Sequence, residues 1–113
     1  MRALVIERPG LAAIHEIAEP QPARDQVLLR IRMVGLCGSD RNSFRGKNPL
    51  VSFPRIPGHE IAATIEAAGD AVPEPFQPGM NVTLSPYTSC GVCPSCRRAR
   101  TNACRSMEAH VLR

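Results

Sequence analysis

Four cysteines in the last quarter of the chain have the spacing of a metal site. They follow the pattern C-x2-C-x2-C-x7-C and are Cys90, Cys93, Cys96 and Cys104. A thiolate at every third residue of a tight loop places three sulfurs around one centre, and the fourth returns after a short excursion. Four sulfurs complete the shell of a tetrahedral ion, and zinc is the natural occupant. The pattern therefore predicts a structural zinc, which contributes to folding and performs no chemistry.

An iron–sulfur centre is the alternative occupant of such a pattern. A ferredoxin-type run also begins C-x2-C-x2-C, but its last step is C-x3-C followed by proline. Here the last cysteine comes after seven residues, and Arg105 follows it. The spacing favours zinc.

A second group of metal-binding side chains lies earlier in the chain. Cys37 is followed 22 residues later by the adjacent pair His59 and Glu60. Thiolate, imidazole and carboxylate are the ligand set of a catalytic zinc, which keeps one coordination position open. The structural alternative is an inert buried thiol with a hydrogen-bonded loop histidine. In that case the chain is a zinc-binding interaction module without catalytic function.

Short apolar segments, separated by turns rich in Pro and Gly, must position these side chains. Strands are predicted over 1–7, 11–17, 27–34, 61–67 and 80–84. We expect Asp40 to cap a short helical turn that ends at Phe44. Cys37 follows the third predicted strand, and His59 precedes the fourth. Strands at intervals of about ten residues, in a chain with eleven prolines, predict a mainly β, barrel-like domain.

Size and charge limit the classes of partner. A chain of 113 residues forms one small domain. Its net charge is +4, and arginines 97, 98, 100 and 105 lie among the cysteines, where they offset the charge of a zinc tetrathiolate. Because no aromatic residue is interleaved with these arginines, no nucleic-acid partner is expected.

The compartment can be predicted from the cysteines and the apolar segments. No apolar run is long enough for a membrane span or a signal peptide, so no membrane partner is expected. Five cysteines without a secretion signal indicate a reducing compartment, and the cytoplasm is the expected one.

Three ordered motifs resemble those of the zinc-dependent alcohol dehydrogenases in the medium-chain dehydrogenase/reductase superfamily. They are GLCGSD at 35–40, PGHE at 57–60, and the four spaced cysteines. The resemblance spans nearly the whole chain, and Ser39 in its setting Cys-Gly-Ser-Asp is most similar to the polyol and threonine dehydrogenase branch. It implies a mainly β fold, namely a GroES-like, partly open β-barrel with a zinc-binding cysteine lobe at about 86–106.

The resemblance also implies a role for each matched residue. Cys37 and His59 would bind the catalytic zinc, with Glu60 beside it. Ser39 would take the alcohol proton, and Asp40 would accept a hydrogen bond from His59 and fix its tautomer. The structural zinc would be held by Cys90, Cys93, Cys96 and Cys104. The reaction would be zinc-activated oxidation of an alcohol or polyol, with hydride transfer to NAD(P).

The chain departs from the family pattern at two points. Many members have a histidine three residues after the relay serine, where this chain has Asn42. Members are also roughly three times as long, and their nucleotide-binding domain follows the part matched here. No G-x-G-x-x-G motif occurs in the sequence. We therefore expect residues 1–113 to be the N-terminal part of the catalytic domain, inactive by itself. Members often form homo-oligomers through the absent domain, so this chain's own oligomeric state stays open.

Overall fold

Residues 1–107, which the computed structural model describes, form a mainly β structure with one short α-helix and two 3-10 helices. The strands are β1 (Arg2–Arg8), β2 (Leu11–Glu16), β3 (Val27–Gly35), β4 (Glu60–Ala68) and β5 (Asn81–Thr83). All five predicted strands are present, and their ends differ from the predicted ones by at most one residue.

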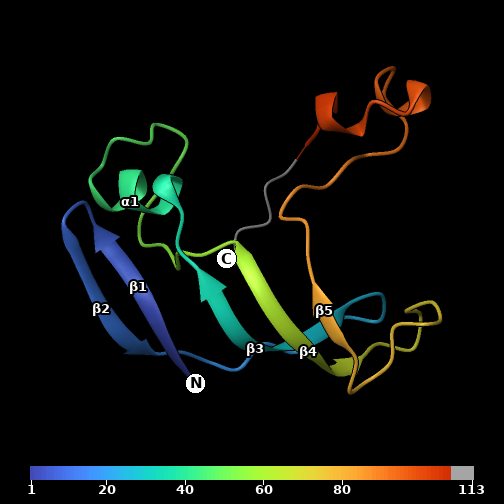
Figure 1. Cartoon of the computed structure of the whole chain (residues 1–113), viewed down its shortest axis with the longest axis horizontal. Coiled ribbons are helices and arrows are strands. Elements are labelled where there is room, and N and C mark those ends of the chain that lie inside the picture. The colour runs from blue at the N-terminus through green and yellow to red at the C-terminus, as the bar shows by residue number, and fades with distance from the viewer. Residues whose placement is uncertain (108–113) are drawn as a thin grey trace.

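The strands form two antiparallel sheets (Figure 1). Strands β1 and β2 form a hairpin, and β3, β4 and β5 follow one another in the second sheet. An isolated bridge between Ile6 and Arg55 connects β1 to the segment that precedes β4. The hairpin and the larger sheet therefore lie on either side of the chain that carries the PGHE motif.

The buried apolar residues of the two sheets come from one face of β4 and from β1. Successive side chains of a strand point to opposite faces, so β4 buries Ile61, Ala63 and Ile65 and turns the residues between them outward. Val5 and Ile6 of β1 are also buried, and Cys104 of the cysteine lobe completes the buried apolar set of the described residues. This small core fixes the strands from which the functional loops emerge.

The short helix α1 (Gly38–Phe44) begins immediately after β3. The expectation that Asp40 caps this helix was wrong, because the N-cap is Cys37 and Asp40 is the third helical residue. The Cys37 side chain accepts from the backbone N–H of Ser39, and the Asp40 carboxylate accepts from the backbone N–H of Cys37. This reciprocal capping box ties the two side chains to one helix end.

The segment with the four spaced cysteines forms a separate lobe beyond β5 (Figure 1). An extended segment leads from β5 to this lobe, which contains the 3-10 helices η1 (Cys96–Arg98) and η2 (Thr101–Ala103). Within residues 1–107, no helix has the length and apolar character needed to cross a membrane.

Candidate metal centres

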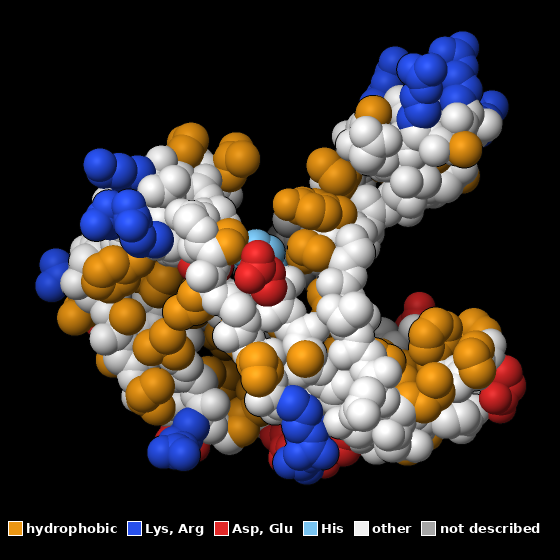
Figure 2. Space-filling model, in the orientation of Figure 1, with side chains coloured by type: hydrophobic (Ala, Val, Ile, Leu, Met, Phe, Trp, Pro, Cys, Tyr) orange, Lys and Arg blue, Asp and Glu red, His pale blue; other side chains and the backbone are white. Residues whose placement is uncertain are grey.

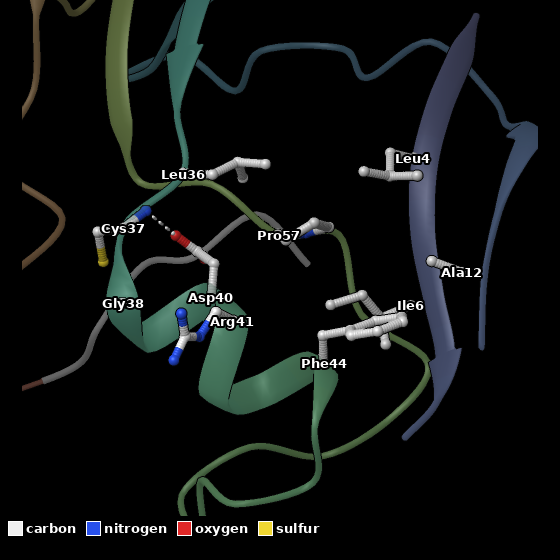
Figure 3. A pocket seen from close by; sticks show the side chains of 10 residues that line it. All are labelled: Leu4, Ile6, Ala12, Leu36, Cys37, Gly38, Asp40, Arg41, Phe44 and Pro57. Atoms are coloured by element: carbon white, nitrogen blue, oxygen red, sulfur yellow. Dashed lines mark hydrogen bonds between the residues drawn. The ribbon is translucent and has the colours of Figure 1, made fainter. Parts of the chain in front are cut away.

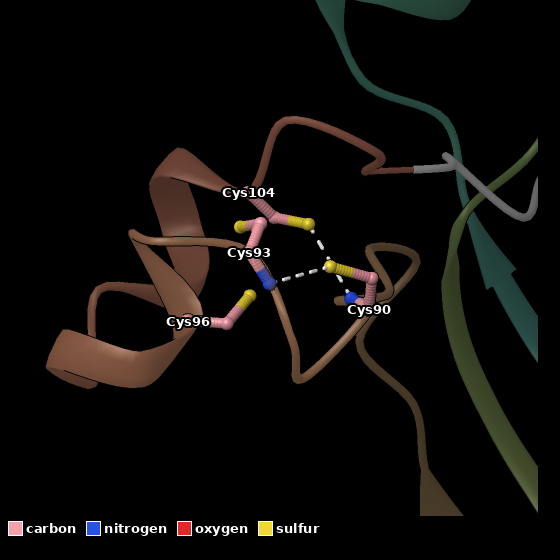
Figure 4. A group of neighbouring side chains, drawn as sticks. All are labelled: Cys90, Cys93, Cys96 and Cys104. Atoms are coloured by element: carbon pink, nitrogen blue, oxygen red, sulfur yellow. Dashed lines mark hydrogen bonds between the residues drawn. The ribbon is translucent and has the colours of Figure 1, made fainter.

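The four cysteines of the lobe converge on one point (Figure 4). The ligand atoms of Cys90, Cys93, Cys96 and Cys104 all lie within 4.8 Å of one another. In a tetrahedral zinc site with four sulfur ligands, the sulfurs are separated by roughly 3.8 Å. The sulfurs are therefore close to the arrangement that a tetrathiolate zinc site requires, and none of these cysteines forms a disulfide.

Backbone N–H groups point at the sulfurs of the lobe. Cys90 N–H donates to Cys104 Sγ at 3.3 Å, and Cys93 N–H donates to Cys90 Sγ at 3.4 Å. Hydrogen bonds from the backbone N–H groups of Arg105 and Cys96 lower the pKa of Cys93 to about 6. Such donors stabilise thiolates, which are the form that binds a metal.

Cys96 differs from its neighbours in its protonation. Desolvation and the adjacent thiols raise the pKa of Cys96 to about 12. A bound dication reverses this balance, since a coordinating thiol is deprotonated outright. The donor set as a whole therefore fits a zinc ion.

The second cluster contains Cys37, Asp40 and His59, whose ligand atoms also lie within 4.8 Å of one another. Cys37 Sγ is 3.3 Å from His59 Nε2. A tetrahedral zinc bound to one sulfur and one imidazole nitrogen holds these atoms roughly 3.6 Å apart. The spacing of the two atoms suits a shared metal.

Asp40 contacts both chain segments that contribute to this cluster. Its side chain is 11% exposed, and its carboxylate accepts from Cys37 N–H at 3.0 Å and from Gly58 N–H at 3.1 Å. The same carboxylate lies 3.6 Å from His59 Nδ1, on the far side of the ring from the sulfur. A negative charge there favours the tautomer with the proton on Nδ1, which leaves Nε2 free for a metal.

The other two predicted site residues occupy different positions around this cluster. Ser39 is exposed, and its Oγ lies 2.9 Å from Cys37 Sγ. Glu60 is exposed at the start of β4 and packs against Gly35, outside the cluster of possible ligands among the described residues. Glu60 and His59 line one hollow, but the Glu60 carboxylate does not lie with the ligand atoms of Cys37 and His59. Its role beside a metal stays a prediction.

Two hollows flank the cluster. The first has a volume of about 510 Å³ and is lined mainly by apolar side chains, including Leu4, Leu36 and Phe44, with Cys37 at its rim (Figure 3). The second has a volume of about 550 Å³ and is lined by His59 and Tyr87. No local motif marks Tyr87 as a site residue, because only the path of the chain after β5 brings it opposite β4.

The family of the chain follows from a comparison with known proteins. Residues 23–111 match the family model described as the alcohol dehydrogenase GroES-like domain. The chain belongs to this family. The GroES-like fold predicted from the motifs is thereby confirmed, together with the resemblance to zinc-dependent alcohol dehydrogenases.

Two curated relatives of this GroES-like domain have dehydrogenase names. A zinc-type alcohol dehydrogenase-like protein of Haemophilus influenzae is 36% identical over 108 residues, which are 96% of this chain and 32% of the relative. Sorbitol dehydrogenase of Bacillus subtilis is 34% identical over 111 residues, covering 96% of this chain and 31% of the relative. The chain thus spans about a third of the length of the curated relatives that it matches.

A solved structure shows the same fold. An Escherichia coli alcohol dehydrogenase, solved in complex with the cofactor NADH, superposes on the GroES-like domain with a TM-score of 0.86 and 34% sequence identity. The match covers 96% of this chain and 31% of the other. The fold is therefore shared with a dehydrogenase that was solved with a nicotinamide cofactor bound.

Proposed function

We propose that this chain is the zinc-binding part of an NAD(P)-dependent alcohol or polyol dehydrogenase. The observation that carries the proposal is the arrangement of Cys37 Sγ opposite His59 Nε2 at 3.3 Å, with the Asp40 carboxylate behind the imidazole. Sulfur and nitrogen donors with an adjacent open hollow are what a catalytic zinc requires. The dehydrogenase names of the relatives support the same reading.

Cys37 and His59 would hold the catalytic zinc, and Asp40 would keep His59 in the metal-binding tautomer. When bound, zinc supplies Lewis acidity that lowers the pKa of a coordinated alcohol. Ser39 Oγ lies beside the Cys37 sulfur and is exposed, so this hydroxyl is placed to accept the alcohol proton while it passes its own proton to solvent water. Asn42 cannot carry that proton further, because an amide does not titrate near neutral pH.

The substrate would enter the second hollow. This hollow has a volume of about 550 Å³, and Glu60, Thr83 and Tyr87 line it together with His59. These groups can form hydrogen bonds to the hydroxyls of a polyol, and a sorbitol dehydrogenase is among the relatives of this chain. A polyol is therefore the proposed substrate class.

The cysteine lobe would hold a second, structural zinc. Its four thiolates close the coordination shell, so no position is left for a substrate. All five cysteines are free thiols, and we place the protein in the cytoplasm, where thiols stay reduced.

The zinc content of the purified chain tests the proposal. We expect close to two zinc ions per chain by elemental analysis, without added metal during purification. Cys37→Ser should remove one zinc and leave the lobe intact, and Cys90→Ser should remove the other. Hydride transfer needs a nucleotide site, which no motif of residues 1–113 supplies, so these residues alone should not oxidise a polyol with NAD.

A zinc-binding interaction module is the competing function. It predicts one zinc in the unmodified chain and no change in zinc content with Cys37→Ser. That result would leave the lobe as the sole metal site and remove the support for catalysis. Steady oxidation of a polyol by the isolated chain would contradict the expected inactivity.

A further inference from the structure

The cysteine lobe carries the whole positive excess of the chain. The net charge is +4, and residues 86–107 contain no acidic residue and four arginines, namely Arg97, Arg98, Arg100 and Arg105. All four are exposed. A zinc ion bound by four thiolates has a net charge of about −2, which offsets only part of the charge of the four guanidinium groups. The zinc-loaded lobe therefore stays positive.

These arginines are not neutralised by the rest of the described chain. Within residues 1–107, every ion pair joins groups that lie between Met1 and Asp70. Arg97 Nε donates to the carbonyl oxygen of Val92 at 2.8 Å. Figure 2 shows basic side chains gathered at the tip of the projecting lobe, with acidic side chains confined to the body of the molecule on the visible face.

A hollow lined mainly by hydroxyl- and amide-bearing residues lies at the base of the same lobe. It has a volume of about 450 Å³, and the ring of Tyr87 and the amide of Asn102 line it. Hydroxyl groups supply most of the remaining polar lining, from Ser85, Thr88, Ser89 and Thr101. The Tyr87 residue is 61% exposed, so its ring is accessible to a ligand.

The fold brings this aromatic residue to the same hollow as the segment between Arg100 and Arg105, although no arginine lines the hollow itself. Tyr87 precedes the first cysteine of the lobe, whereas Thr101 and Asn102 lie between Arg100 and Arg105. All of the hollow's residues named above nevertheless face one space. The sequence has no aromatic residue between these arginines, whereas in the fold Tyr87 shares one hollow with Thr101 and Asn102.

We propose that the cysteine lobe binds nucleotides of single-stranded nucleic acid. The Tyr87 ring stacks on one base, and the hydroxyls and the Asn102 amide form hydrogen bonds to the base and the sugar. The guanidinium groups of Arg98, Arg100 and Arg105 contact phosphates, for which their planar donor geometry is suited. An acidic protein surface would engage the arginines but leave the hydroxyl-lined hollow unfilled, so the nucleotide accounts for more of the observed chemistry.

This binding activity goes beyond the proposed dehydrogenase function. It uses none of the ligands of the Cys37–His59 cluster and needs no turnover, and Tyr87 is the one described residue that lines both this hollow and the proposed substrate hollow. A free nucleotide offers the same base, sugar and phosphate, so the experiment must distinguish it from a strand.

The test measures fluorescence anisotropy of a fluorescein-labelled, mixed-sequence DNA single strand of about twelve nucleotides with the zinc-loaded chain. Three phosphate contacts predict a slope of about −2 for log K against log salt concentration, so affinity falls roughly 20-fold between about 50 and 200 mM NaCl. Tyr87→Ser should weaken binding roughly tenfold, and Tyr87→Phe should stay within about twofold of the unmodified chain.

The double variant Arg98→Gln/Arg100→Gln should weaken binding and reduce the slope to about −0.7. Its matched control is Arg8→Gln/Arg45→Gln, which removes the same charge from exposed positions outside the lobe and should bind as the unmodified chain does. Zinc content is measured for every variant, so that a misfolded lobe is recognised. If Tyr87→Ser loses zinc, the affinity of Tyr87→Phe is the one compared with that of the unmodified chain.

Three results would overturn the proposal. They are no binding at about 50 mM NaCl, equal weakening by the control pair and the lobe pair, or unchanged affinity in zinc-loaded Tyr87→Ser. Competition with AMP then identifies the source of the nucleotide. Displacement of the strand by AMP at a similar concentration supports a free nucleotide, and displacement only at large excess supports the strand.

Discussion

Cys37 and His59 are 22 residues apart in the chain, yet Cys37 Sγ and His59 Nε2 lie 3.3 Å apart. The pairing of β3 with β4 causes this approach. Gly35 at the end of β3 is opposite Glu60 at the start of β4, so the chain leaving one strand and the chain entering the other meet at one sheet end. The geometry of the candidate metal site therefore depends on the register of this strand pair.

Asp40→Asn should weaken zinc binding at the Cys37–His59 cluster by about 10- to 100-fold. The carboxylate accepts from two backbone N–H groups and lies behind His59, whereas an amide offers only one acceptor. Loss of a charged hydrogen bond should also lower the free energy of unfolding by about 1–3 kcal/mol. Competition with a chromophoric chelator measures the first effect, and chemical denaturation measures the second.

The matched control for this prediction is Glu60→Gln, the same chemical change at an exposed carboxylate outside the cluster. It should reduce zinc affinity less than Asp40→Asn does. Equal effects of the two substitutions would remove the assigned role of Asp40.

Gly58→Ala should destabilise the segment that carries His59. Gly58 has a φ of +101°, and a Cβ atom there would overlap Val34 Cγ1. Gly10→Ala is the matched control, since Gly10 has a φ of +78° with nothing within 4 Å of the added atom. Backbone strain alone costs about 1–2 kcal/mol, and the overlap at Gly58 should add about 1–3 kcal/mol. Equal denaturation midpoints for the two variants would contradict the predicted overlap.

Removal of zinc should unfold the cysteine lobe and leave the sheets intact. Within residues 86–107, Cys104 is the one buried residue, so the metal replaces an apolar core. Zinc binding contributes about 10–16 kcal/mol in comparable small metal modules. Hydrogen exchange after chelation should become fast at residues 90–104 while the amides of β4 stay protected. Persistent protection of the lobe would show that zinc does not hold it.

Ile65→Ala should be the most destabilising single truncation of the sheet core. Ile65 is 2% exposed, and truncation of a buried isoleucine costs about 2–5 kcal/mol. Ile14→Ala removes the same atoms from a side chain that is 63% exposed, and its effect should stay within about 0.5 kcal/mol. The midpoint of urea denaturation distinguishes the two, and similar midpoints would contradict the assigned core.

The sequence by itself determined the local elements and the identity of the metal-binding side chains. The alternation of apolar residues and the Pro- and Gly-rich turns predicted all five strands, because both signals act within a few residues. The lobe cysteines were predictable for the same reason, since their spacing is that of one continuous loop.

The tertiary structure decided the contacts between residues that are far apart in the chain. Whether Cys37 faces His59 depends on the β3–β4 register, and whether Glu60 shares their cluster depends on which side of the chain it occupies. The N-cap also could not be assigned from the residue type, because Asp40 serves better as the third helical residue that accepts from Cys37 N–H. The position of Tyr87 in one hollow with Thr101 and Asn102 depends on the path of the chain after β5, which no local pattern encodes.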